Sequence, residues 1–272
     1  MRSSILNPIE REKYKPKDQA MSSPCLLVGI SGPSSSGKTT LSRLLRDIIP
    51  GTFILHLDDF YLPDSQIPVK NGLQDWDCVE SLNLLTLRNA LLHVKTHGTP
   101  PPDLVSIEDL NAVGEHNVPE TTIQEWKNRI QGLVESKNWT TPIAIVDGFL
   151  LFSESMAKIR DLFDIKLFLR TSYSAVKARR EARQGYVTID GFWEDPPGYV
   201  DRIVWPNYVA DHEFLFKDKN VEGKLDEEVC REIGIWGMPD GAQEGMEKCF
   251  VWAARILEGV LKESLEESRH GS

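Results

Sequence analysis

The sequence predicts an α/β fold in which a mostly parallel sheet of five strands carries helices on both faces and a small lid. Apolar runs of strand length alternate along the chain with amphipathic stretches of helical length. The runs are apolar at successive positions, as expected for strands that are buried on both faces of a parallel sheet. With 272 residues, 40% of them hydrophobic, the chain is long enough to build one sizeable core.

The first predicted strand is the apolar run 25–31, which is followed by a glycine- and serine-rich loop and a helix with leucine or isoleucine at helical spacing. Further strands are predicted at residues 53–57, 143–146, 165–169 and, as a short fifth strand, 213–216. Helices are predicted near residues 79–96 and 120–136 and, as an amphipathic final helix, from residue 246 to residue 261.

The predicted domain organisation is a flexible tail at residues 1–24 followed by a single domain at residues 25–268. The tail is polar and contains three prolines. About 85 residues separate the second and third predicted strands, which is too many for a simple crossover and indicates an insertion. Its middle, at about 96–120, has four prolines and few large apolar residues. We therefore expect a mobile surface loop, with residues 100–115 dispensable for catalysis.

Charge and cysteine content exclude several classes of function. The formal net charge of −10 disfavours binding to nucleic acid and to anionic membranes, and no apolar run approaches the ~20 residues that a membrane helix needs. The four cysteines stand singly, which disfavours a zinc site and a disulfide framework. We expect a cytoplasmic or nucleocytoplasmic protein that acts on small molecules, and the sequence leaves its oligomeric state open.

Residues 32–39, GPSSSGKT, match the phosphate-loop pattern GxxxxGK[ST] and lie between a predicted strand and a predicted helix. In such a loop the backbone N–H groups hold a polyphosphate, Lys38 reaches the β- and γ-phosphates, and the Thr39 hydroxyl binds Mg²⁺. The alternative is a flexible connector with a chance lysine. The pattern predicts ATP and Mg²⁺ as ligands, with ATP bound by Gly32, Pro33, Ser34, Ser35, Ser36, Gly37, Lys38, Thr39 and Thr40.

Two acidic positions follow predicted strands. Asp58 comes directly after the second strand, at the edge where open α/β sheets bind ligands, and is suited to take a proton from an attacking hydroxyl. Asp147 ends the third strand in the manner of a Walker B acid. In each case the alternative is a turn or helix cap. The predicted metal ligands are Thr39, Asp58 and Asp147.

A basic segment at residues 166–183 precedes a hinge-like loop at about 184–198. Its six basic residues stand against one acid in a chain that is acidic overall. The simplest explanation is an exposed basic helix face. The functional alternative is a lid that brings arginines over ATP.

Five stretches together resemble the nicotinamide riboside kinase family, especially its fungal members, and uridine kinases are near relatives of that family. They are GISGPSSSGKTTL at 29–41, LDDFYLPDSQIP at 57–68, LQDWDCVESLN at 73–83, VDGFLLF at 146–152 and PPGYVDRIVWPNY at 196–208. The resemblance runs from about residue 25 to the final helix, without the 96–120 loop.

This resemblance implies a P-loop kinase fold and ATP-dependent phosphorylation of nicotinamide riboside, and of nicotinic acid riboside, at the ribose 5′-hydroxyl, in NAD salvage. It implies that Asp58 is the base and that Lys38 acts with it in catalysis. The other implied roles are substrate contact for Asp59, Phe60, Tyr61 and Arg180, stacking on the pyridine ring for Trp76, binding of the ribose hydroxyls for Asp77, and ATP contact for Arg179 and Arg183.

The chain departs from the family pattern at two places. Asp147 stands where the family often has Glu, and the 185–198 lid differs from shorter versions. A uridine or cytidine kinase remains the nearest alternative, since it shares the phosphate machinery. From another class, a P-loop switch or nucleotide-binding protein is disfavoured, because no NKxD motif is present and Trp76–Asp77 has no role there. By itself, Trp76 is also explained as a core tryptophan.

Overall fold

The computed structural model describes residues 24–107, 115–183 and 185–270. The predicted tail therefore lies outside the described residues, apart from Pro24. The central sheet has five strands, all parallel, in the order β2-β5-β1-β6-β9. This confirms the predicted α/β class and the parallel five-stranded sheet. The strands are β1 (Leu26–Ser31), β2 (Thr52–His56), β5 (Ile143–Gly148), β6 (Ile165–Phe168) and β9 (Ile235–Gly237).

The predicted fifth strand at residues 213–216 is wrong. Glu213–Leu215 forms a 3₁₀ turn that continues from helix α7 (Trp205–His212), and Leu215 and Phe216 pack into the core from there. The fifth strand is β9, which pairs with β6 through three residues. A strand of three residues at a sheet edge is too short to show a hydrophobic period, so the sequence pattern could not reveal it.

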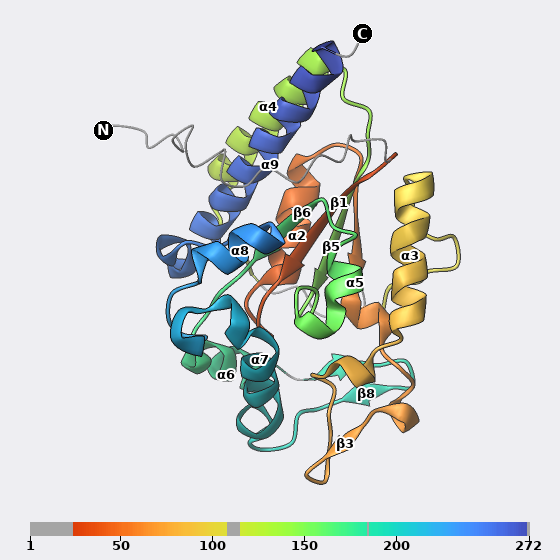
Figure 1. The fold of residues 1–272 in the computed structure, drawn as a ribbon, viewed down its shortest axis with the longest axis vertical. Coiled ribbons are helices and arrows are strands. Elements are labelled where there is room, and N and C mark those ends of the chain that lie inside the picture. The colour runs from red at the N-terminus through yellow and green to blue at the C-terminus, as the bar shows by residue number, and fades with distance from the viewer. Residues whose placement is uncertain (1–23, 108–114, 184, 271–272) are drawn as a thin grey trace.

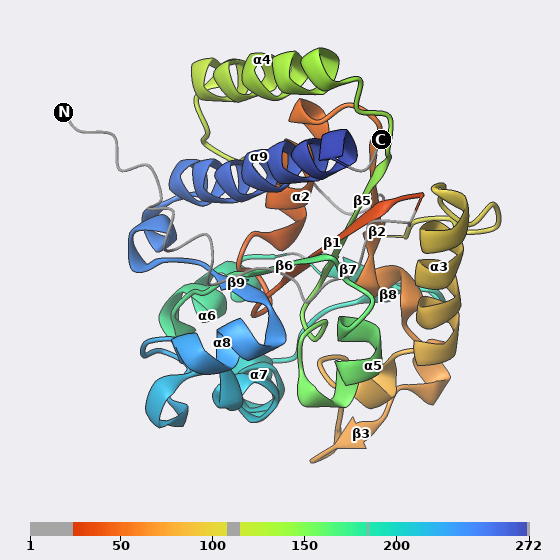
Figure 2. The same ribbon diagram turned by 45° about the horizontal axis from the view of Figure 1, so that its top comes forward.

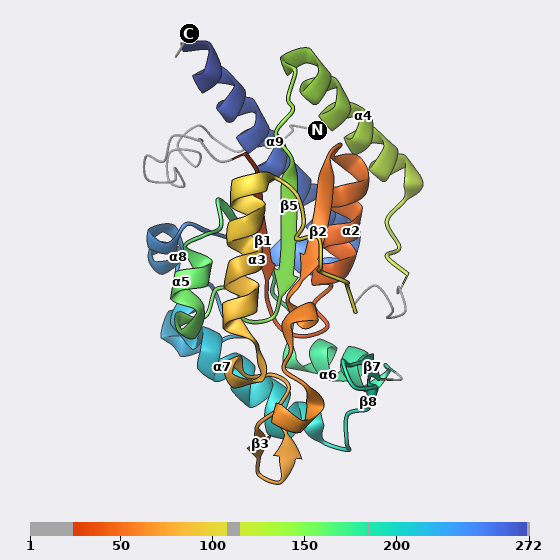
Figure 3. The ribbon, with the colours of Figure 1, turned by 90° about the vertical axis from the view of Figure 1, so that its right-hand side faces the viewer.

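Helices cover both faces of the sheet. Successive strand residues point to opposite faces, and the helices on each face pack against one of two apolar clusters. In β1, Leu27 belongs to one cluster and Leu26, Val28 and Ile30 to the other. Figure 3 shows the sheet between the two helical layers. One face carries α2 (Lys38–Ile48), α4 (Glu120–Lys137) and α9 (Met246–His270). The other carries α3 (Leu84–His97), α5 (Ala157–Arg160), α7 and α8 (Glu227–Ile233).

The helix predicted near 79–96 begins later than expected. Residues Val79–Ser81 form a 3₁₀ turn, and α3 starts after Asn83, whose side chain accepts a hydrogen bond from the backbone N–H of Thr86. Asparagine is a favoured N-cap because it satisfies a donor that the first turn leaves unpaired. The predicted helices at 120–136 and from 246 match α4 and α9.

Two small hairpins extend from one end of the sheet. The hairpins are β3 (Val69–Lys70) with β4 (Leu73–Gln74), and β7 (Tyr186–Val187) with β8 (Phe192–Trp193). In Figures 1 and 3 both hairpins lie below the sheet, and Figure 3 shows α6 (Tyr173–Glu181) beside β7 and β8; in Figure 2 the hairpin that contains β3 lies at the bottom of the view. A third apolar cluster, which includes Ile67, Trp76 and Tyr199, holds this region together. The predicted lid is therefore a packed hairpin.

The insertion between α3 and α4 is more structured than expected. Leu104 packs against the core and Val118 is buried, while residues 108–114 lie outside the described part. Helix α4 runs beside α9, and Arg129 donates to both carboxylate oxygens of Glu258 at 2.6 and 2.7 Å. Leu104 and Val118 thus pack against the rest of the fold, and the expectation that residues 100–115 are dispensable for catalysis stays a prediction. Among the described residues, no helix combines the length and apolar character that a membrane crossing requires.

Candidate active site

The phosphate loop takes a backbone path that requires its glycines. Gly32 has a φ of +145°, and a Cβ there would lie 2.5 Å from the carbonyl oxygen of Leu169. Gly37 has a φ of +95° and sits at the N-cap of α2. Both conformations are accessible to glycine and strained for other residues. The loop therefore turns sharply from β1 into the N-terminus of α2, where backbone N–H groups can hold an anion.

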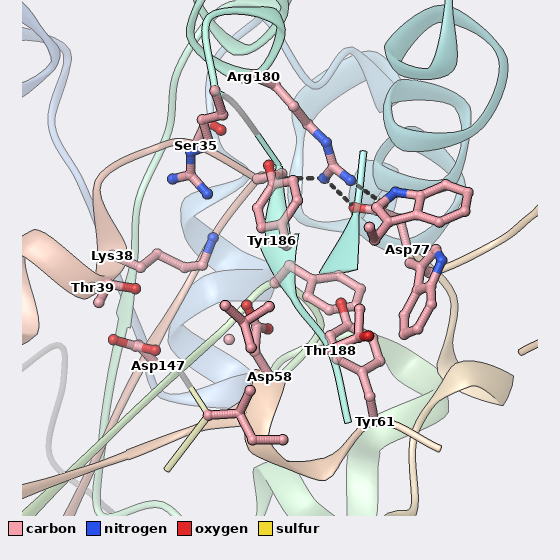
Figure 4. Close-up of a pocket in the computed structure, with 18 of the residues that line it drawn as sticks. Ser35, Lys38, Thr39, Asp58, Tyr61, Asp77, Asp147, Arg180, Tyr186 and Thr188 are labelled. Atoms are coloured by element: carbon pink, nitrogen blue, oxygen red, sulfur yellow. Dashed lines mark hydrogen bonds and ion pairs between the residues drawn. The ribbon is translucent and has the colours of Figure 1, made fainter. Parts of the chain in front are cut away.

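Lys38 enters the cavity from the first turn of α2. Its ammonium donates to the carbonyl oxygen of Pro33 at 2.8 Å. Burial lowers the pKa of Lys38 to about 8, and the nearby carboxylates of Asp58 and Asp147 oppose that shift. Figure 4 shows these three side chains facing the same space. The lysine thus faces two acids across the place where phosphates would lie.

Asp147 is held by a histidine on the neighbouring strand. His56 and Asp147 are register partners at the ends of β2 and β5, and Nδ1 of His56 lies 2.9 Å from Oδ1 of Asp147. Both side chains are almost fully buried. Among the described residues, Oδ2 of Asp147 has no hydrogen-bond partner although it is buried. One carboxylate oxygen is therefore oriented by the histidine, and the other is left for a ligand.

The residues of the short helical turn Leu57–Phe60 lie in different surroundings. Leu57 and Phe60 are buried in the core, whereas Asp58 and the following Tyr61 line the cavity. Asp59 does not line the cavity. Its carboxylate accepts hydrogen bonds from the insertion between α3 and α4. Adjacent residues thus have separate tasks, because a helical turn projects its side chains in different directions.

An aromatic wall forms the far side of the cavity. The Trp76 ring meets Tyr61 edge-on at 5.2 Å between centroids and lies 5.7 Å from the Trp193 ring of β8. The backbone N–H of Trp76 donates to the Tyr199 hydroxyl at 3.0 Å. Among the described residues its buried indole Nε1 has no partner. A polar group of a bound ligand would satisfy that donor.

A buried arginine joins this wall to the lid hairpin. Arg180 donates to the two oxygens of Asp77 at 2.9 Å each, and its Nε donates to Asp195 at 2.6 Å. Burial raises the pKa of Asp77 above its ordinary value, and the Arg180 guanidinium opposes that shift. Asp195 also accepts from the indole N–H of Trp193 at 2.9 Å. The guanidinium therefore holds together a pocket carboxylate and the lid.

These groups surround one cavity of about 930 Å³, part of which is open to solvent. Its lining comes from the phosphate loop, the ends of β2 and β5, and the lid. The lining residues are Ser34, Ser35, Gly37, Lys38, Thr39, Thr40, Asp58, Tyr61, Trp76, Asp77, Ile107, Asp147, Gly148, Phe149, Arg180, Arg183, Tyr186, Val187, Thr188 and Trp193.

Comparison with known proteins identifies the family. A protein of Schizosaccharomyces pombe named nicotinamide riboside kinase is 42% identical over 201 residues, which cover 74% of this chain and 84% of that protein. The chain belongs to the nicotinamide riboside kinase family. Relatives of the same name from Eremothecium gossypii and Saccharomyces cerevisiae are 36% and 34% identical, each over 76% of this chain and covering 84% and 86% of their own lengths. No protein-family model matches the chain.

Most residues that the sequence patterns or the resemblance to nicotinamide riboside kinases assigned to the site line this cavity. Several do not line it. Gly32, Pro33 and Ser36 shape the phosphate loop from outside, and Phe60 is a core residue. Arg179 is exposed, and its Nη1 donates to the carbonyl oxygen of Ser35 at 3.3 Å. The predicted residues that line the cavity are Ser34, Ser35, Gly37, Lys38, Thr39, Thr40, Asp58, Tyr61, Trp76, Asp77, Asp147, Arg180 and Arg183.

Sequence reasoning missed two groups of lining residues. Gly148 and Phe149 stand inside the VDGFLLF stretch, so that segment was named without these residues. The same is true of the expected lid, which contains the lining residues Tyr186, Val187, Thr188 and Trp193. No sequence pattern pointed to Ile107 as a site residue. It belongs to the insertion, and only the folded chain brings it to the cavity.

Proposed function

We propose that this chain transfers the γ-phosphoryl group of ATP to the ribose 5′-hydroxyl of nicotinamide riboside, which gives nicotinamide mononucleotide and ADP. The observation that carries the proposal is one cavity with a phosphate loop at one end and Asp58, Trp76 and Asp77 at the other. A phosphate donor and a hydroxyl acceptor need to meet in such a space. The names of the fungal relatives supply the acceptor.

The phosphate end would bind ATP through backbone N–H groups of residues 32–39 and through Lys38. Arg183 lines the same space and adds positive charge above it. Positioned cations of this kind stabilise the charge of a phosphoryl group in transfer. Arg179 is exposed and lies outside the cavity lining, so in this proposal it would contact the donor nucleotide from its solvent side.

Thr39, Asp58 and Asp147 fit a magnesium site. All three line the cavity, and they offer the hydroxyl and carboxylate oxygens that Mg²⁺ prefers. The unpartnered Oδ2 of Asp147 supports this assignment, since a buried carboxylate oxygen without a donor is costly unless a cation or water meets it. When bound, Mg²⁺ would supply positive charge that neutralises the phosphates during transfer.

Asp58 would accept the proton of the 5′-hydroxyl as the oxygen attacks the γ-phosphorus. The bond between the γ-phosphorus and the bridging oxygen breaks, and that oxygen leaves with ADP. Asp58 stands between the phosphate loop and the aromatic wall, which is where an attacking hydroxyl must lie. Its role is to orient the nucleophile in line with the leaving group as much as to take the proton.

The acceptor end suits a cationic aromatic base. Trp76 and Trp193 offer indole faces, and a pyridinium is attracted to such a face by ~0.5–2 kcal/mol. Each Asp77 oxygen already accepts from Arg180 and still has a lone pair for a ribose hydroxyl. Nicotinic acid riboside fits the same arrangement as a second substrate. A neutral uracil or cytosine would gain less from it, which disfavours the uridine or cytidine kinase alternative.

The proposal is tested with a nucleoside panel. Purified protein is incubated with ATP and Mg²⁺ and, in turn, nicotinamide riboside, nicotinic acid riboside, uridine, cytidine and no nucleoside, and ADP release and product mass are measured. We expect a phosphorylated product with the pyridine ribosides and little ADP without nucleoside. Preferential phosphorylation of uridine would favour the pyrimidine kinase, and equal ADP release with and without nucleosides would favour a switch protein. Chelation of Mg²⁺ should abolish transfer.

A further inference from the structure

The carboxylate of Asp59 connects the insertion between α3 and α4 to the active-site turn. Its Oδ1 accepts a hydrogen bond from the backbone N–H of Ile107 at 2.7 Å and from the Ser106 hydroxyl at 3.1 Å. We name residues 104–107 the strap. At its start Leu104 packs against the core, at its end Ile107 lines the cavity, and Val105 between them is 81% exposed. One side of the strap thus faces water and the other faces the site.

We propose that Asp59 is a positioning residue that holds the strap as a wall of the acceptor half of the cavity. This inference rests on the proposed function, and it replaces the direct substrate contact that the resemblance implied for Asp59. It also contradicts the expectation that residues 100–115 are dispensable.

The chain neighbours of Asp59 belong to the acceptor half of the cavity. Asp58 and Tyr61 on either side line the cavity, and Tyr61 packs edge-on against Trp76. The hydrogen bond from Ile107 to Asp59 therefore brings the strap to the turn that carries the proposed base and leads into the aromatic wall. Its loss should weaken nucleoside binding more than ATP binding.

The strap in turn helps to hold the turn Leu57–Phe60, which carries Asp58. Leu57 and Phe60 anchor the inner side of the turn in the core, and the backbone carbonyl of Phe60 accepts from Asn83 N–H at 2.8 Å. The strap secures the outer side through Asp59. The turn that carries Asp58 is thereby held from both sides, which limits the movement of the proposed base.

Two substitutions distinguish a hydrogen-bonding role of Asp59 in holding the strap from an electrostatic role of its charge on substrate or metal. An asparagine at position 59 keeps an oxygen that accepts from Ile107 N–H, whereas alanine has none. If Asp59 acts through the strap, Asp59→Asn should retain most of the wild-type nucleoside affinity and Asp59→Ala should not. If Asp59 instead acts on substrate or metal by its charge, both variants should be impaired alike.

The test combines kinetics with proteolysis. We expect Asp59→Ala to raise the KM for nicotinamide riboside about five- to twentyfold, which corresponds to about 1–1.8 kcal/mol and to the loss of one or two ordinary hydrogen bonds, with the KM for ATP within about twofold. Thermolysin should cut the strap of Asp59→Ala faster than that of the wild type or Asp59→Asn. In a double-mutant cycle, Ser106→Ala should have an effect in the wild type and little further effect in Asp59→Ala.

Asp226→Ala is the matched control. Asp226 accepts from two backbone N–H groups at the start of α8, at 3.0 and 3.3 Å, and does not line the cavity. It should lower the melting temperature without changing either KM. Unchanged kinetics and proteolysis in Asp59→Ala, or equal impairment of Asp59→Asn and Asp59→Ala, would overturn the strap assignment. If the wild type does not phosphorylate nicotinamide riboside, the proposed function fails, while the proteolysis result still decides whether Asp59 holds the strap.

Discussion

Asn207 and Asp75 form a buried pair across 132 residues of sequence. The side-chain amide of Asn207 donates to both oxygens of Asp75, at 2.8 and 2.9 Å, and approaches the backbone carbonyl oxygen of Asp77 at 3.1 Å. Asp75 in turn accepts from the backbone N–H of Asp77 at 3.1 Å. The pair therefore holds both backbone polar groups of Asp77, the residue proposed to bind ribose. It gives a physical role to the asparagine of the WPNY stretch.

Replacing Asn207 by alanine should impair both stability and nucleoside binding. The Asp75 carboxylate would remain buried without its amide donor, which should lower the free energy of unfolding by about 1.5–3 kcal/mol. We expect a higher KM for nicotinamide riboside with a smaller change for ATP. Urea unfolding and steady-state kinetics measure the two effects. Adding Asp75→Asn should recover part of the stability, because it removes the buried charge. Loss of stability with unchanged KM values would leave the pair a purely structural role.

Lys38→Ala and Asp58→Asn should each lower kcat by ~10²-fold or more, since positioned acid–base groups typically contribute ~10²–10⁴ in rate. Both side chains line the cavity, and neither substitution adds bulk. Single-turnover rates measure the chemical step, and thermal unfolding serves as the control for folding. An Asp58→Asn protein with wild-type turnover would contradict the base assignment.

Trp76→Ala should weaken nicotinamide riboside much more than ATP, by up to about thirtyfold if the stacking loss reaches ~2 kcal/mol. Trp76→Phe should keep most of the affinity because it retains an aromatic face. Binding of each substrate is measured by calorimetry. Because Trp76 is also buried against Tyr61 and Trp193, its loss should lower the melting temperature. Equal losses for both substrates would show that only this packing matters.

Asp211→Asn should stabilise the protein at neutral pH. Burial raises the pKa of Asp211 to about 6, from an ordinary 3.8, and the charges of Glu80 and Asp75 add to the shift. The folded state therefore holds its proton to higher pH than the unfolded state, and stability falls as the pH rises from about 4 to 6. The variant should melt higher than the wild type at pH 7.5, with the difference shrinking toward pH 4. The same difference at both pH values would contradict this origin.

Local patterns explain what could be predicted of the fold. The phosphate loop, the strand before it and the helix after it occupy contiguous residues, so their geometry follows from glycine conformations and apolar runs. The same holds for Asp58 and Asp147, since residues at the carboxyl ends of parallel strands meet at one edge of a sheet. Strand β9 escaped prediction because three residues carry too little periodicity.

The sequence by itself thus determined the fold class, the phosphate site and the candidate base. Only the tertiary structure showed that adjacent residues of one turn face different partners. Asp58 lines the cavity whereas Asp59 holds the strap, and Arg180 is buried on Asp77 whereas Arg179 is exposed. Neighbours on a helical turn project to different sides, and their partners lie far along the chain, 48 residues away for Asp59 and 103 for Arg180. Such contacts form only when the elements pack, so no local pattern specifies them.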